Sequence, residues 1–248
     1  MTFISSYRRR GWYDAPMADA RIEIGHRMGE FFLDSFRDAK ERLWIMTPWL
    51  STEYADLLLE RKAAGVDVRV TTSNDFVPGQ REAINRLLER HERVTRPENK
   101  QLLTWGTWLM IGGVVLALFT SGITLVIALV GLILFLRGKE LRQPYWVSKL
   151  GEGNLRVLES NPYRMVHAKV YVADDTVLLG SANLTGNGTK HNVEAMAAIV
   201  DADLAAHTRE EILRVPEAQR FREVPYDVLG RGIAQAAIQN VHRRRRKH

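Results

Sequence analysis

Apolar residues in the first hundred positions recur with two periods, that of a helix and that of a strand. From Met28 to Ala39 they recur at helical spacing, and the run RLWIMTPWL at 42–50 has the length of a buried strand. Ser51 is a favourable residue to begin the next helix, and Gly65 a favourable one to end it. The predicted order is helix, strand, helix, strand and helix, over residues 28–39, 42–50, 52–64, 66–73 and 84–88. Such alternation is typical of a layered α/β domain.

After position 150 the pattern changes to a series of strands with little between them. The predicted strands are NLRVLES, MVHAKVYVAD, TVLLGSA and VEAMAAIVD, at 154–160, 165–174, 176–182 and 193–201. Strands that follow one another closely pair antiparallel, so the sheet is expected to be mixed. Neither part of the chain makes a complete layered fold alone. We therefore predict one discontinuous domain, with Arg69 and Tyr171 in the same sheet.

Between these two parts lies an apolar stretch, residues 101–136, that contains no charged residue. A membrane span needs about 20 apolar residues, so this stretch is too long for one helix and long enough for two legs of about 17 residues. It predicts a transmembrane hairpin with helices over Leu102–Phe119 and Ile123–Leu136 and a turn at 120–122. The short legs leave open a re-entrant hairpin, and the other alternative is a pair of buried helices in a soluble domain.

Basic residues flank the predicted hairpin on both sides, whereas its turn carries no charge. The positive-inside rule then predicts a multi-pass membrane protein whose soluble parts and active site lie on the cytoplasmic side. The basic flanks are Arg93, Arg96, Lys100, Arg137, Lys139 and Arg142. The predicted organisation is an α/β domain in two parts at 1–100 and 137–225, the hairpin at 101–136, and a C-terminal helix with a polybasic tail at 226–248.

Composition narrows the chemistry that this chain can perform. It has 248 residues and no cysteine, which excludes disulfides, a thiolate zinc site and a cysteine nucleophile. The net charge is +6 and the pI is about 9.7, which favours contact with an anionic partner. Nucleic acid and an anionic membrane surface both fit that charge. The tail HRRRRKH suits either one.

One predicted strand carries a histidine and a lysine two positions apart. His167, Lys169 and Tyr171 are expected on one face of that strand, while the intervening apolar residues form the core face. An imidazole beside an ammonium suits a phosphate, because the cation binds the oxygens while the imidazole attacks or protonates. Further polar residues follow along the chain, and the carboxylate among them could orient a histidine ring. They are Ser181, Asn183, Asn192 and Glu194, with Gly180 allowing close approach of the backbone.

The segment HAKVYVAD, followed by GSAN, resembles the His-x-Lys-x4-Asp signature of the phospholipase D superfamily. The matching positions are His167, Lys169 and Asp174, and then Gly180, Ser181 and Asn183. The runs DAKERLWIMTPWL and RKAAGVDVRVTTS resemble the opening strands and helix of that fold. The segment NVE resembles the part of the family pattern that contains a glutamate, which is Glu194 in this chain. The resemblance covers about residues 20–200 without the apolar stretch. It implies an α/β fold with a layered mixed sheet flanked by helices, here interrupted by the transmembrane hairpin.

The resemblance implies phosphodiester chemistry through a phosphohistidine, with no metal ion and no cofactor. The implied catalytic residues are His167, Lys169, Asn183, Glu194, Ser181 and Asp174, of which the last usually has a structural role. In the family two such motifs meet at one active site, one histidine attacking and the other protonating the leaving oxygen. No other histidine of this chain is followed two positions later by lysine. A homodimer that completes the active site is therefore expected.

The predicted substrate is a phospholipid, hydrolysed at the phosphatidyl group or transferred to an alcohol as in cardiolipin-type synthases. Membrane lipids, anionic ones first, are then the expected partners. Nucleic acid is the alternative partner, for a membrane-anchored, metal-independent endonuclease. A phosphate- or lipid-binding scaffold that has kept the motif without catalysis is the second alternative.

Overall fold

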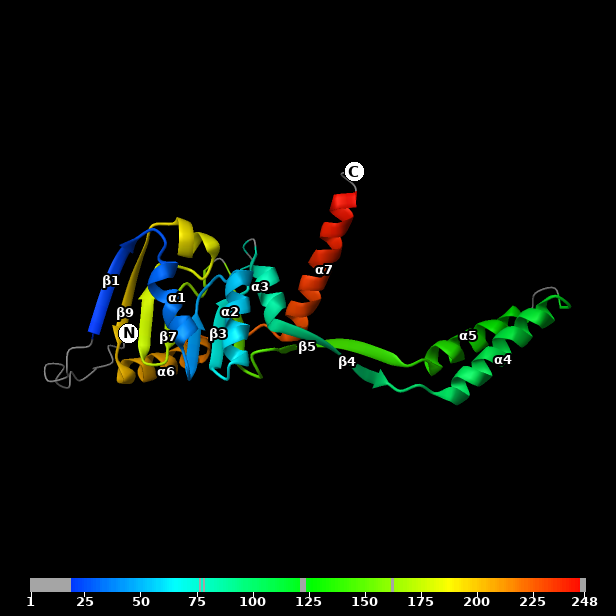
Figure 1. The fold of residues 1–248 in the computed structure, drawn as a ribbon. Coiled ribbons are helices and arrows are strands. Elements are labelled where there is room, and N and C mark those ends of the chain that lie inside the picture. Colours follow the sequence, from blue (N-terminus) through cyan, green and yellow to red (C-terminus); the bar gives the residue numbers. More distant parts are fainter. Residues whose placement is uncertain (1–18, 76, 78, 121–123, 162, 246–248) are drawn as a thin grey trace, which may run out of the picture. The chain divides into compact units, whose positions relative to one another are not determined.

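The computed structural model describes residues 19–245 except 76, 78, 121–123 and 162. The chain divides into two compact units (Figure 1). One joins the residues up to Glu89 to those from Val147 onward, and the other is Arg90–Trp146. The second unit begins before and ends beyond the apolar stretch, because strands at its base belong to it.

The first unit is built on a seven-stranded sheet with the order β1-β9-β8-β7-β2-β3-β6 among the described residues. Strands β2, β3 and β6 are parallel, and the pairs from β2 to β7 and on to β1 are antiparallel. The expected mixed sheet is therefore confirmed, and Arg69 in β3 lies in the same sheet as Tyr171 in β7. The strands are β1 (Asp19–Gly25), β2 (Arg42–Met46), β3 (Asp67–Ser73), β6 (Leu155–Leu158), β7 (Val170–Ala173), β8 (Thr176–Gly180) and β9 (Glu194–Val200).

Helices cover both faces of this sheet (Figure 1). On one face Phe32 and Phe36 of α1 pack against the ring of Tyr171, each with a centroid separation of 5.5 Å. On the other face Val172 belongs to a buried cluster that includes Ile212 of α6. The helices of this unit are α1 (Gly29–Asp38), α2 (Thr52–Ala63), α3 (Gln80–Leu87), α6 (Ala202–Ala218) and α7 (Tyr226–Arg245), with a π-helical turn η1 (Asn187–His191).

The spacing from His167 predicted that Tyr171 lies on a face open to the site, and it does not. Its side chain is fully buried, and its hydroxyl donates to the carbonyl of Ala182 at 2.6 Å. Burial raises the pKa of this phenol well above its usual value. Since helices cover both faces of β7, an alternating strand pattern does not reveal here which face carries the chemistry.

The second unit is a two-stranded ribbon that leads into a pair of helices. The strands β4 (Leu88–Arg96) and β5 (Leu141–Ser148) pair with each other, and α4 (Lys100–Ala117) and α5 (Leu125–Gly138) follow between them. The side chain of Asn99 caps α4 by accepting from the backbone N–H of Leu102 at 3.1 Å. The helices approach closely at glycines: a Cβ on Gly131 would lie 2.4 Å from the backbone nitrogen of Met110.

The predicted transmembrane hairpin is wrong as a membrane-crossing structure. Two helices do form near the expected positions, but α4 has 18 residues and α5 has 14, which at 1.5 Å a residue gives lengths of about 27 and 21 Å. The apolar core of a bilayer is about 30 Å thick. Among the described residues no helix has both the length and the apolar character needed to cross a membrane. The multi-pass localisation that was inferred from the flanking charges is therefore wrong as well.

Candidate active site

His167 and Lys169 lie in an extended segment that precedes β7, rather than within a strand over 165–174. The backbone carbonyl of Lys169 accepts from the N–H of Gly180 at 3.2 Å, which holds the segment beside the end of β8. The sheet pairing therefore extends to Lys169, while His167 lies beyond its end. This placement leaves the imidazole exposed and the lysine 7% exposed.

The side chains of His167 and Lys169 lie in contact. Lys169 Nζ lies 3.1 Å from Nδ1 and 3.2 Å from Nε2 of His167, and it donates to the His167 carbonyl at 2.8 Å. Burial lowers the pKa of Lys169 below its usual 10.5, and the charge of Glu194 partly opposes this effect. The ammonium and the imidazole can thus contact one and the same phosphate group.

Glu194 is held at the start of β9 by two neighbouring side chains. Its carboxylate accepts from the hydroxyl of Ser181 and from the amide of Asn192, the latter at 3.1 Å. The backbone N–H of Ala195 also donates to the Ser181 hydroxyl oxygen, at 3.0 Å. Among the described hydrogen bonds none joins Glu194 to the His167 ring. The structure thus places Glu194 and Ser181 in a network that holds negative charge near Lys169.

Gly180 and Asn183 show how closely the chain is packed where β8 ends. A Cβ on Gly180 would lie 2.0 Å from the carbonyl oxygen of Ala195, so a larger residue does not fit. Gly188 in η1 packs in a similar way on the backbone of Asn183, where a Cβ would lie 2.6 Å from its carbonyl oxygen. Asn183 Oδ1 is buried and has no hydrogen-bond partner among the described residues.

Asp174 lies in the turn after β7, away from the imidazole and ammonium pair. Its carboxylate accepts from the backbone N–H groups of Lys40, Glu41 and Arg42 at 2.8, 2.9 and 2.8 Å. Burial alone would raise the pKa of this carboxyl, but the three N–H donors and the charge of Arg42 outweigh it and the pKa lies below its usual value. Asp174 therefore ties the β7–β8 turn to the start of β2.

A further residue near the histidine carries no motif and was not predicted. The ring of Trp49 meets His167 edge to face, with centroids 6.0 Å apart and an interplanar angle of 85°. Its indole nitrogen is buried without a hydrogen-bond partner among the described residues. Trp49 follows β2, and the carboxyl ends of strands are where α/β sheets bind ligands. That position is the one signal in the sequence that could have identified it.

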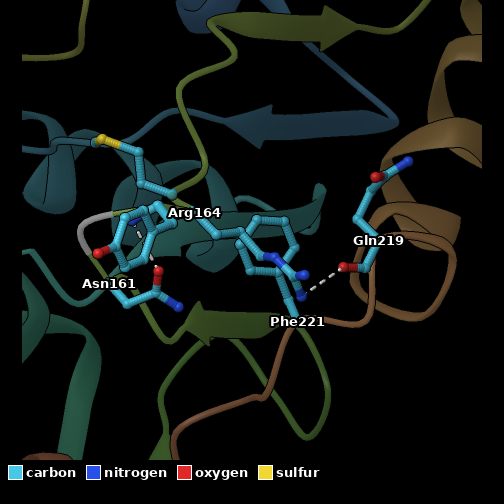
Figure 2. A pocket seen from close by; sticks show the side chains of 6 residues that line it. Asn161, Arg164, Gln219 and Phe221 are labelled. Carbon is cyan, nitrogen blue, oxygen red and sulfur yellow. Dashed lines mark hydrogen bonds between the residues drawn. The ribbon is translucent and has the colours of Figure 1, made fainter.

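A pocket of about 540 Å³ lies along the loop that leads from β6 to the motif (Figure 2). Arg164 crosses it, donating to the carbonyls of Gln219 and Arg220 at 3.1 and 3.0 Å and lying 5.8 Å from the ring centroid of Phe221. None of the six candidate catalytic residues lines this pocket. Nor do the described residues include a group of three or more His, Asp or Glu placed to hold a metal ion.

Comparison with known proteins gives one family match. The model for the cardiolipin synthase PLD-like domain matches residues 137–215, about a third of the chain. A comparison with curated proteins gave no match.

Comparison with solved structures gives matches of low sequence identity, all with TM-scores below 0.5. Nuc from Salmonella typhimurium, described as a phospholipase D family member, is 14% identical with a TM-score of 0.46, over 84% of this chain and 99% of that one. NucT from Helicobacter pylori is 13% identical with a TM-score of 0.42, over 85% and 100%. Phosphatidylserine synthase from Haemophilus influenzae is 14% identical with a TM-score of 0.45, over 93% and 46%. Likeness at this level says nothing of activity.

The range matched by the family model contains His167, Lys169 and the other four candidate catalytic residues. It also covers strands β6 to β9, whose ends position those residues. Residues 137–215 thus resemble a PLD-like domain, and the match supports the phospholipase D superfamily for that part of the chain.

Proposed function

We propose that this protein is a phosphodiesterase or phosphatidyltransferase that acts through a phosphohistidine on His167. The observation that carries the proposal is the approach of Lys169 Nζ to within 3.1 Å of the imidazole. A ring nitrogen of His167 attacks phosphorus, and the bond from phosphorus to the leaving alcohol oxygen breaks. Lys169 and the amide of Asn183 hold the charged phosphoryl oxygens. Ser181 and Glu194 are proposed to support Lys169 through their hydrogen-bond network, and Asp174 is proposed to have a structural role outside the mechanism.

The leaving oxygen needs a proton, and a second imidazole is its natural source. We propose that the His167 of a second copy supplies it, so that a homodimer forms one active site. Water or an acceptor alcohol then attacks the phosphohistidine, its proton passes to that second imidazole, and the P–N bond breaks. The cycle returns both rings to their starting protonation states. It needs no oxidant or reductant.

Phospholipid is the substrate class that the observations favour. The support is the family match, because the matched model is that of a cardiolipin synthase domain and spans all six candidate residues. Hydrolysis releases the headgroup alcohol, and transfer replaces it by another alcohol.

Nucleic acid is a second candidate substrate, favoured by the net charge of +6 and the pI of about 9.7. The third candidate is a phosphate- or lipid-binding scaffold without turnover, and its support is the motif that contains His167 and Lys169.

The full-length protein should be incubated with vesicles of mixed anionic phospholipids and, separately, with single- and double-stranded nucleic acid, all in EDTA. Lipid turnover that His167→Ala abolishes and His207→Ala leaves intact supports the proposal; His207 is an exposed histidine on α6, away from the motif. Nucleic-acid cleavage with the same dependence supports the second candidate. Binding without turnover of either substrate contradicts the catalytic proposal and supports a scaffold.

The dimer is tested with two differently tagged copies, co-expressed and purified through both tags. A heterodimer of wild-type and His167→Ala chains should lose nearly all activity, because each site needs both imidazoles. A heterodimer with His207→Ala should keep it. The dimer proposal would be contradicted if the heterodimer with His167→Ala had the same activity per wild-type chain as the wild-type homodimer. An active monomer would contradict it as well, because one copy would then be sufficient.

A further inference from the structure

The loop between β2 and α2 holds Trp49 in a fixed position. The carbonyl of Pro48 accepts from Thr72 Oγ1 at 3.1 Å and from Gln80 Nε2 at 3.3 Å. The N–H of Ser51 donates to the carbonyl of Leu184 at 2.8 Å. The backbone on both sides of Trp49 is therefore tied to neighbouring elements. A side chain on such a backbone can be preorganised for binding.

The same contacts bring this loop beside the polar end of β8. Leu50 and Leu184 form a parallel bridge, so the residues that precede them, Trp49 and Asn183, are neighbours in register. Each of these two side chains has a buried polar atom without a partner among the described residues: the indole Nε1 and the amide Oδ1. The loop that carries Trp49 and the end of β8 that carries Asn183 therefore each hold one such atom, and the Trp49 ring meets the ring of His167 edge to face.

A buried donor without an acceptor costs about 1–3 kcal/mol, so proteins rarely retain one without a use. The indole N–H is a donor and never an acceptor, so the group that satisfies it must be an acceptor. The neighbouring His167 is exposed, so a ligand that reaches its ring also lies beside Trp49. A phosphoryl oxygen is an acceptor, and its negative charge strengthens the bond.

We propose that Trp49 is a phosphate-binding residue of the active site, whose indole N–H donates to a non-bridging oxygen of the phosphodiester attacked by His167. The proposal rests on the proposed function and adds a third donor, from the first part of the chain, to those of Lys169 and Asn183. It assigns the loop after β2 to substrate binding. That loop lies outside the range of the family match.

Trp44 lies in β2, the strand that precedes this loop, and provides a matched control. Its indole N–H already donates to Asp67 Oδ2 at 3.0 Å, and its side chain is buried in the core cluster. A ligand at His167 should leave the Trp44 signal in place. The Trp49 signal should move, because its N–H acquires a charged acceptor.

The full-length protein labelled with ¹⁵N-tryptophan and ¹⁵N-histidine should give a separate indole N–H signal for each of its 6 tryptophans, and the ring signals of its histidines report on His167. Replacing Trp49 or Trp44 by phenylalanine assigns the two signals of interest. Orthovanadate, an anion that imitates phosphate, is then added to the wild-type protein. The expected result is a downfield shift of the Trp49 signal that saturates together with the perturbation of the His167 ring, and a Trp44 signal that stays in place.

Turnover provides the second measurement, with bis(p-nitrophenyl) phosphate as an activated phosphodiester substrate. Trp49→Phe keeps an aromatic side chain and removes the donor, so kcat/KM should fall about 10- to 100-fold, as expected for loss of one hydrogen bond to a charged group. Trp44→Phe should change kcat/KM little.

Vanadate that perturbs His167 but leaves the Trp49 signal in place, with kcat/KM unchanged in Trp49→Phe, overturns this inference and leaves the proposed function intact. Vanadate that perturbs neither residue overturns the phosphate site itself, and with it both proposals. The shift is measured on the wild-type protein, so a poorly folded variant does not prevent a decision.

Discussion

Asp174 should stabilise the fold without taking part in catalysis, and Asp174→Asn separates these two roles. Asp174 has a φ of 50°, in the left-handed region that asparagine adopts nearly as readily as aspartate. The substitution therefore keeps the turn geometry and removes the charge. Alanine would add backbone strain to the measured effect.

The size of the effect follows from which oxygen each donor uses. Asp174 Oδ1 accepts from Glu41 and Arg42, and an asparagine carbonyl can retain both bonds in weaker, uncharged form. Oδ2 accepts from Lys40, and there the asparagine NH₂ would face an N–H donor. A hydrogen bond to a charged group contributes about 1.5–3 kcal/mol, less where water competes as it does at this partly exposed carboxylate. The free energy of unfolding should fall by about 2 kcal/mol.

Urea unfolding followed by near-ultraviolet circular dichroism measures this loss, with Asp175→Asn in the same turn as the control. The difference between wild type and Asp174→Asn should also depend on pH. The folded-state pKa of Asp174 lies below its usual 3.8, so its contribution is complete above that value and disappears as the pH falls through the lower folded-state pKa. Equal stability of the two proteins at pH 7, or normal stability with lost turnover, would refute a structural role.

Other outcomes follow from the same contacts. Burial lowers the pKa of Lys169, so this residue should lose its charge, and turnover should fall, at an alkaline pH below 10.5. Lys169→Arg should move that fall in turnover to higher pH, because arginine keeps its charge. Gly180→Ala should lower the free energy of unfolding by about 3 kcal/mol, measured by thermal denaturation, because its Cβ would lie 2.0 Å from a backbone oxygen. Gly232→Ala, in open space within α7, should not lower it and should raise it by up to about 1 kcal/mol, because alanine favours a helix over glycine. Gly131→Ala should increase hydrogen exchange across α4 and α5, whereas Gly112→Ala, also in open space, should not.

Much of the sheet was predictable because its central strands are short, apolar and bounded by clear turns. The strands β2, β3, β6, β8 and β9 all fall within predicted segments. Two strands were missed for different reasons. β1 alternates only over a short segment, and its isoleucines are exposed rather than buried. β4 is highly charged and shows no alternation. Their strand conformation comes from pairing with β9 and β5, and sequence period alone carries no record of a partner.

The site could be predicted where its residues are close together in sequence, and not where the fold brings them together. His167 and Lys169 were found by their spacing, and the structure does place them in contact. Tyr171 shares that spacing but belongs to the core, because helices cover both faces of β7. Trp49 approaches His167 through the parallel bridge of Leu50 and Leu184, a tertiary contact that leaves no local pattern.

The ribbon of β4 and β5 has a consequence for how the sheet can assemble. The parallel pairing of β3 with β6 joins Val70 to Leu155 across the whole second unit, and a flexible insertion of that length would add about 1 kcal/mol to the entropy cost of closing the chain. The N–H of Lys149 instead donates to the carbonyl of Leu87 at 2.9 Å. The chain therefore leaves the first unit at the end of α3 and returns to it at nearly the same point, so the second unit closes the chain as a short turn would.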